Sequence, residues 1–135
     1  MNAEPLVISR LKSLLDIGLR IEELKLLKNG WLNGKGLAPV HDGLDRLALA
    51  FDKNYPADAL PLPHLYPTPE GRVRAEWSLH PNEISLEIDV RSQKGSWHNL
   101  DLENDAEDTQ EVDLNQETGW EWLVSQIRQH SEMNG

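Results

Sequence analysis

The sequence predicts a single α+β domain spanning residues 1–135. Two N-terminal helices, an antiparallel sheet of three to four strands and a C-terminal helix packed on one face of the sheet are expected. Three observations lead to this fold class. Apolar residues recur at steps of three and four near both ends of the chain, which is typical of amphipathic helices. In the middle they alternate with polar residues, which is typical of strands. A chain of 135 residues is also long enough for one hydrophobic core without disulfides or a metal.

Two helices are expected first. One covers residues 6–28 and ends at Asn29-Gly30, and its apolar stripe is Val7, Leu11, Leu14, Ile17, Ile21, Leu24 and Leu27. The other covers residues 41–55, with Asp42 and Asp45 in its first turn and the stripe Leu44, Leu47, Ala48, Phe51 and Tyr55. The turn-rich segment between them contains Trp31.

The sheet is expected over residues 72–115, after a proline-rich crossing at 56–71 in which His64 to Tyr66 could form a brief edge strand. Alternation predicts a hairpin that buries two rows, Val73, Ala75, Trp77 and Leu79, then Ile84, Leu86, Ile88 and Val90. A third strand is expected from Trp97 to Leu102. The acidic stretch Asn104 to Gln110 is expected to be a solvated loop before a short fourth strand at Val112 and Leu114, and a last helix covers 118–131.

The charge of the chain is unevenly distributed. Of the 23 acidic residues, ten lie after residue 100, where Arg128 is the one basic residue, and the formal net charge is −10. Such a chain is repelled by phosphate backbones, so direct nucleic-acid binding is not expected and a basic protein partner is. Solubility alone is the competing explanation. The sequence contains no cysteine, no membrane-spanning apolar run and no secretory signal pattern, so a cytoplasmic protein is expected.

Several motifs together resemble an uncharacterised family of small bacterial proteins. They are the turn Gly30-Trp31-Leu32-Asn33-Gly34, the segment Tyr66-Pro67-Thr68-Pro69-Glu70-Gly71, the strand Ala75-Glu76-Trp77 and the strand Ser85-Leu86-Glu87-Ile88-Asp89. The similarity covers roughly residues 20 to 128. It departs at Arg72, where similar proteins have a second glycine, and at Asn33, where aspartate is commoner. The resemblance implies a shared fold and a role in bacterial toxin–antitoxin or phage-defence operons.

The sequence shows no established catalytic or phosphate-binding motif, so no cofactor and no catalytic residue are predicted. A metal site would need residues brought together by the fold, for example His80 and His98 with Asp89 or Asp101. The paired carboxylates Glu87 and Asp89 could do acid–base work or hold Mg²⁺, and a metal-dependent hydrolase would use them with His80 and His98. Glu87 and Asp89 share a strand face that Arg72, Arg74 and Arg91 can also reach, so cross-strand ion pairs are the simpler expectation.

Of the five tryptophans, Trp77 and Trp120 are expected in the core. Trp31 lies in a glycine-rich turn and Trp122 lies off the apolar stripe of its helix, so either is a candidate interface residue if exposed. For Trp31, filling the gap between helix and sheet is the favoured alternative.

The leading functional hypothesis is a non-enzymatic, acidic protein-interaction module, antitoxin-like or an accessory subunit. Its candidate partner-binding residues are Asp101, Glu103, Asp105, Glu107 and Asp108, with Trp31 and Trp122. Two alternatives remain open. One is an inhibitor that mimics nucleic acid with the carboxylates from Asp101 to Asp113, and the other is a small metal-dependent hydrolase. Binding by mimicry is expected to weaken steeply with salt.

Overall fold

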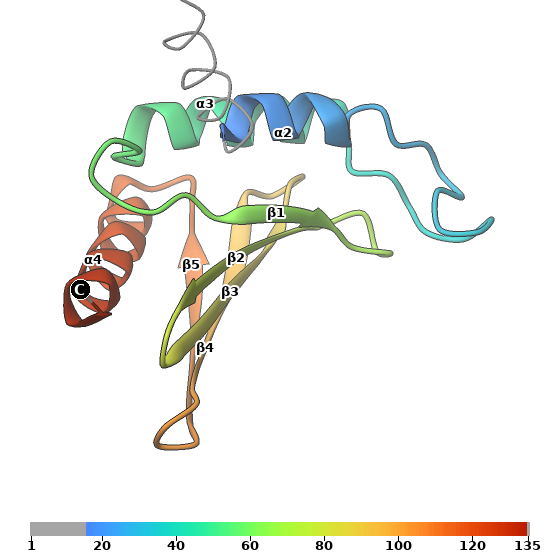
Figure 1. Ribbon diagram of the computed structural model, residues 1–135. Helices are drawn as coiled ribbons and strands as arrows, with labels where there is room; N and C mark the ends of the chain where they lie inside the picture. The colour runs from blue at the N-terminus through green and yellow to red at the C-terminus, as the bar shows by residue number, and fades with distance from the viewer. Residues whose placement is uncertain (1–15, 135) are drawn as a thin grey trace, which may run out of the picture.

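The computed structural model describes residues 16–134, with side chains as far as Glu132. Its helices are α2 (Ile17–Leu24), α3 (His41–Asn54) and α4 (Glu117–Asn134). The strands follow one another in space in the order of the chain and pair antiparallel throughout (Figure 1); they are β1 (His64–Pro67), β2 (Val73–Leu79), β3 (Asn82–Asp89), β4 (Lys94–Asp101) and β5 (Ala106–Asp113). The predicted α+β class is therefore confirmed.

The helices differ from the prediction mainly at the N-terminal end. The helix expected over 6–28 is observed as α2, which ends at Leu24, while its expected start lies outside the described residues. Beyond Leu24 the backbone hydrogen bonds span three residues instead of four, from Leu26 N to Glu23 O and from Leu27 N to Leu24 O, so the chain tightens into a turn where the α-helix was expected to continue. α3 and α4 lie within a few residues of their predicted bounds.

The predicted hairpin is confirmed as β2 and β3, with Trp77 opposite Ile84 and one row of each strand buried. The strand count was too low, since the sheet has five strands. The short strand at His64 is present as β1, and of the acidic stretch Asn104 to Gln110, predicted to be a loop, residues 106–110 instead pair with β4 as part of β5, while 104 and 105 lie in the turn. β5 gave no alternation because residues 106–111 are exposed on both faces, so no row of side chains had to be apolar.

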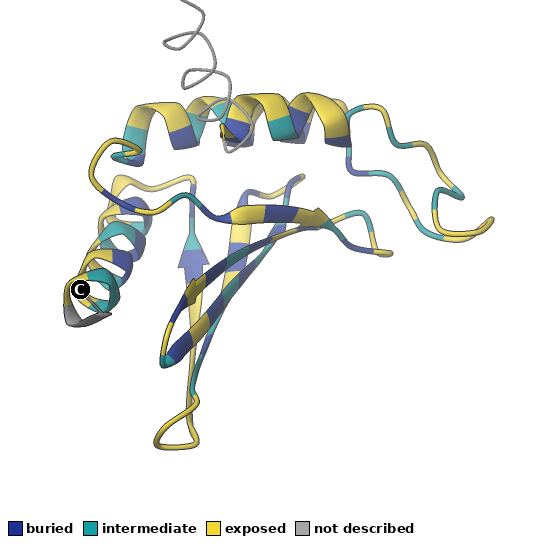
Figure 2. Cartoon of the chain, in the orientation of Figure 1, coloured by how far each residue is buried: buried dark blue, intermediate teal, exposed yellow. Residues whose placement is uncertain are grey.

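The three helices cover one face of the sheet, called here the inner face; the other is the outer face (Figure 2). Trp77 stands at the centre of the inner face and is 2% exposed. Around it the aromatic rings form a chain in which Phe51 meets Trp120 edge-on at 4.9 Å between centroids and Trp97 meets Trp122 edge-on at 5.2 Å. Such contacts add to the burial of apolar area, so the aromatic chain ties α3 and α4 to the sheet.

One polar network lies inside this core. The Trp77 indole Nε1 donates to the Tyr55 hydroxyl at 3.1 Å and to the Pro61 carbonyl at 3.2 Å, and the Tyr55 hydroxyl donates to the same carbonyl. All three residues come from different segments, the inner sheet face, the end of α3 and the proline-rich crossing. Burial raises the pKa of Tyr55 to about 12, because the charged phenolate would lose its contact with water.

Two glycines allow the helices to approach the sheet closely. A side-chain carbon on Gly43 would lie 2.3 Å from the Val90 carbonyl oxygen, and one on Gly119 would lie 2.0 Å from the Asp113 carbonyl oxygen. Beside the first contact the buried Gln93 amide donates to the carbonyls of Gly43 and Val90, at 3.0 and 2.6 Å. The start of α3 is thereby fixed to the β3–β4 turn, and the start of α4 to the end of β5.

We expect Trp77→Ala to destabilise the protein by about 3–5 kcal/mol, because it removes a fully buried ring and the donor of the core network. Urea unfolding followed by circular dichroism measures this. Leu49→Ala, at a side chain 71% exposed, is the control and should change stability by less than about 0.5 kcal/mol. Overlapping curves for Trp77→Ala and the parent would show that Trp77 is not in the core.

The raised pKa of Tyr55 predicts that the protein loses stability at high pH. Its folded pKa of about 12 lies above the ordinary value of 10.0, so folding favours the protonated hydroxyl. This contribution is complete below pH 10 and is lost as the pH rises through 12. Between those limits the parent should lose about 2 kcal/mol more than Tyr55→Phe, measured by urea unfolding at each pH. Parallel pH curves for the two proteins would contradict the burial of this hydroxyl.

Candidate functional site

The hairpin formed by β4 and β5 extends beyond the layer of helices at the lower end of Figure 1. Residues 102–111, which make its tip and most of β5, are all exposed. The core ends at the base of this tip with two buried amides, where Asn99 Nδ2 donates to Asn82 Oδ1 at 3.0 Å. Past this polar pair the hairpin is held mainly by its own strand pairing.

The structure brings the five predicted acidic residues together in this hairpin. Asp101 ends β4, Glu103 and Asp105 lie in the turn, and Glu107 and Asp108 begin β5. Glu107 pairs with Leu100 and faces outward, where its Oε2 lies 3.7 Å from His98 Nε2. Asp108 pairs with the buried Asn99 and therefore lies on the opposite face. The carboxylates surround the hairpin instead of forming one row.

Asp101 differs from the other four because its carboxylate holds the turn. It accepts hydrogen bonds from the Asn104 side chain at 2.8 Å and from the backbone N–H groups of Glu103 and Asn104, at 3.0 and 3.1 Å. These bonds, with that from the Asn104 side chain largest, lower the pKa of Asp101. Asp101 therefore shapes the tip, while Glu103, Asp105, Glu107 and Asp108 present exposed carboxylates.

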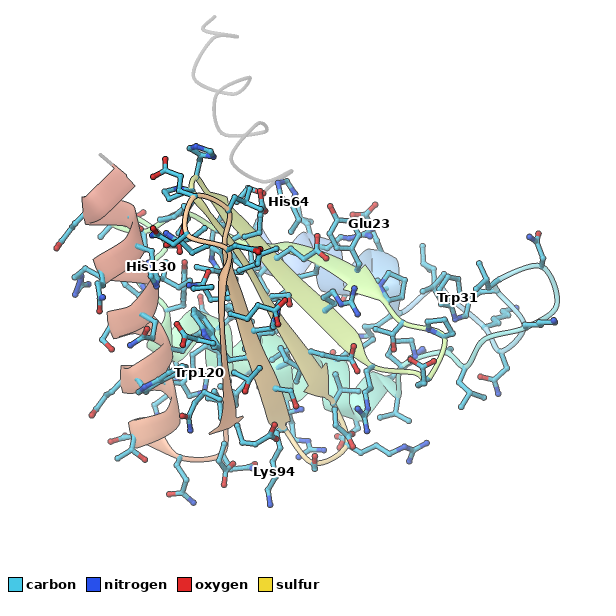
Figure 3. All side chains as sticks on the ribbon, turned by 90° about the horizontal axis from the view of Figure 1, so that it is seen from below. Glu23, Trp31, His64, Lys94, Trp120 and His130 are labelled. Carbon is cyan, nitrogen blue, oxygen red and sulfur yellow. The ribbon has the colours of Figure 1, made fainter. Side chains whose placement is uncertain are left out.

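Trp31 does not fill a gap between helix and sheet. It lies in a small loop that projects away from the sheet, as Figure 3 shows, and is half-buried against that loop. Its indole Nε1 donates to the Leu37 carbonyl at 2.8 Å, and Gly36, at φ +89°, lies directly beneath the ring. Leu32 and Leu37 in the same loop are 43% and 55% exposed.

The motifs behind the family resemblance meet in the structure. Leu37 N donates to the Pro69 carbonyl at 2.8 Å, so the Trp31 loop is joined to the proline-rich turn. In that turn the buried Thr68 hydroxyl accepts from Arg72 N at 3.0 Å. These contacts give both motif segments a structural role.

Trp122 is half-buried, because its ring lies edge-on against Trp97. As an interface residue it would offer only part of its ring. The two expected core residues, Trp77 and Trp120, are both 2% exposed, as predicted.

The structure does not bring His80, His98, Glu87 and Asp89 into one cleft. Glu87 lies between two arginines, 3.3 Å from Arg72 and 3.2 Å from Arg74, as the ion-pair expectation required. Asp89 lies at the far end of β3 and accepts from the backbone N–H of Arg91 at 3.0 Å. His80 lies by the other end of the strand, 3.8 Å from Glu103. Within residues 16–134 no three His, Cys, Asp or Glu side chains are placed to hold a metal ion.

An open groove of about 610 Å³ lies between the start of α2 and the end of α3. Its ionisable lining groups are Asp16, Asp52, Asp58 and Tyr55. The Tyr55 hydroxyl is already engaged in the core network, so the three carboxylates give the groove an acidic rim.

Comparison of the chain with protein-family models, with curated protein sequences and with solved structures finds no match. The family resemblance noted in the sequence thus stays a prediction. Over the part of the chain that the structure describes, no helix has the length and apolar character needed to cross a bilayer.

Proposed function

We propose that this protein is a non-enzymatic, acidic interaction module that binds a basic protein segment through the β4–β5 hairpin. The observation behind the proposal is the concentration of exposed carboxylates on a hairpin that extends past the core. Glu103, Asp105, Glu107 and Asp108 are all exposed, and in the described residues the basic side chains within 4.0 Å of this group are His80, 3.8 Å from Glu103, and His98, 3.7 Å from Glu107. Carboxylates left unneutralised attract cationic partners and speed their association.

The arrangement favours a protein segment over mimicry of nucleic acid. One nucleic-acid strand carries its phosphates in a row about 3.4 Å apart along the axis, whereas the neighbouring carboxylates Glu107 and Asp108 lie on opposite faces of β5. Asp101 is committed to the turn. A polypeptide that follows the hairpin can reach carboxylates on either face.

The biological setting of the proposal follows from the family resemblance. We place the protein in the cytoplasm as an antitoxin-like or accessory subunit of a bacterial toxin–antitoxin or defence operon. A basic protein encoded beside it would be the first partner to test.

The hairpin is tested by capture with three matched baits. The first is the parent, the second carries Glu103→Gln, Asp105→Asn, Glu107→Gln and Asp108→Asn, and the control carries Glu23→Gln, Asp52→Asn, Asp58→Asn and Glu70→Gln. Both variants lose four negative charges at exposed positions, so they differ only in where the charge is removed. Asp101 is left unchanged so that the turn keeps its hydrogen bonds.

We expect the parent and the control to retain one basic protein in stoichiometric amount and the hairpin variant to lose it. With that partner in hand, association with the parent should slow at least about tenfold between 50 and 200 mM salt, whereas association with the hairpin variant should change little. Stopped-flow fluorescence measures both rates. Equal retention by all three baits, or rates that do not depend on salt, would contradict the proposal.

A further inference from the structure

We infer that the outer edge of β5 binds its basic partner as an added, sixth strand, with residues 106–111 as the pairing segment. This inference rests on the proposed function and specifies how the partner is held. An added strand gains affinity from main-chain hydrogen bonds and specificity from alternate side chains.

Within residues 16–134 no further strand pairs with the outer edge of β5, and the strand is regular. β5 is the last strand of the sheet, and its pairing with β4 runs through eight consecutive residues with no bulge and no proline. Residues 106–111 are exposed, whereas Val112 is buried and Asp113 lies close under Gly119 of α4. The segment of β5 accessible to a partner is therefore 106–111, and α4 limits it at the Val112 end.

The alternation of the hydrogen bonds between β4 and β5 shows which backbone N–H and C=O groups of β5 point away from the sheet. Leu114 N donates to the Gln93 carbonyl at 2.9 Å, directly beyond the first pair of the β4–β5 register. In an antiparallel pair the bonded positions alternate, so Ala106, Asp108 and Gln110 bond to β4. The N–H and C=O groups of Glu107, Thr109 and Glu111 consequently point away from the sheet. The Glu111 carbonyl accepts a bond from the exposed Gln110 side chain at 3.0 Å, as expected for an outward group.

The other edge of the sheet is protected. β1 has four residues, follows Pro63 and ends at Pro67, and its Leu65 carbonyl accepts a hydrogen bond from Arg20 of α2 at 2.9 Å. Prolines, short length and a covering side chain are the usual protections of edge strands. β5 has eight residues and no proline, and it differs from β1 by carrying charge of one sign; the Gln110 side chain bonds to the Glu111 carbonyl at its edge.

The negative charge of β5 determines which kind of strand can pair with its outer edge. Two copies of β5 side by side would bring carboxylates opposite carboxylates, which is unfavourable. A strand with lysine or arginine at alternate positions would place basic side chains opposite Glu107 and Glu111 and form favourable pairs on the outer face. Glu111 is held in position by Ser96, whose hydroxyl donates to it at 2.9 Å. The preferred ligand is therefore an extended segment with basic residues at alternate positions.

The test uses the acetylated peptide Lys-Val-Lys-Thr-Lys-Val-Lys, with the same peptide carrying glutamate for lysine as the charge control. Upon addition of the lysine peptide at about 50 mM salt, amide hydrogen exchange measured by NMR should slow at Glu107, Thr109 and Glu111 and stay unchanged at Asp108 and Gln110. This alternation is specific for strand addition. Binding through charge alone would not produce it.

Two substitutions at Thr109 distinguish the contribution of its backbone N–H to peptide binding from that of its side chain. Thr109→Pro removes an outward N–H while keeping every charge, and an edge strand tolerates proline where its N–H faces solvent. We expect about tenfold weaker peptide binding for Thr109→Pro and less than about threefold change for Thr109→Val, measured by fluorescence anisotropy.

The outcomes distinguish this inference from the proposed function. If Thr109→Pro binds the peptide as the parent does while Glu107→Gln with Glu111→Gln weakens it, strand addition is overturned and charge-based binding at the hairpin stands. If the lysine peptide protects no amide of β5, strand addition is likewise overturned. The proposed function fails on different results, namely equal capture by the three baits or association rates that do not depend on salt.

Discussion

The fold depends on covering one face of a single antiparallel sheet, and the Trp77 ring is the point where that cover is anchored. Its burial supplies apolar contact, while its Nε1 joins the end of α3 to the proline-rich crossing through Tyr55 and Pro61. A buried donor without partners would cost stability, so the network also fixes which segment passes beneath the ring. The close contacts at Gly43 and Gly119 then set the heights of α3 and α4 above the sheet.

Sequence patterns predicted those strands of the fold that have one face in the core and the other in water. β2 and β3 alternate because one row is buried and the other meets water, so the faces of Trp77 and Glu87 followed directly from residue order. β5 has water on both sides over most of its length, and a strand of this kind has no period to detect. The acidic residues were identified as a candidate site, but the outward backbone groups of Thr109 and Glu111 depend on pairing phase, which composition does not contain.

The charges and the core are separated in space. The aromatic chain from Phe51 to Trp122 lies under the helices, whereas the carboxylates of Glu103, Asp105 and Glu107 stand past the last buried amides and that of Asp108 lies opposite one of them. Their like charges repel one another at a distance from the core, where solvent screens them. Stability and surface charge can thus change independently in this protein. Asp101 is the exception, since its carboxylate is part of the turn.

The unequal edges of the sheet have a consequence for stoichiometry. Arg20 and two prolines protect the β1 side, so within the described residues β5 is the one edge of this sheet at which pairing can begin. A sheet open on both sides can polymerise, adding molecules end to end into a fibre. A sheet open on one side is monovalent. Copies of this protein therefore cannot add to one another end to end through both edges of their sheets, as a fibre requires.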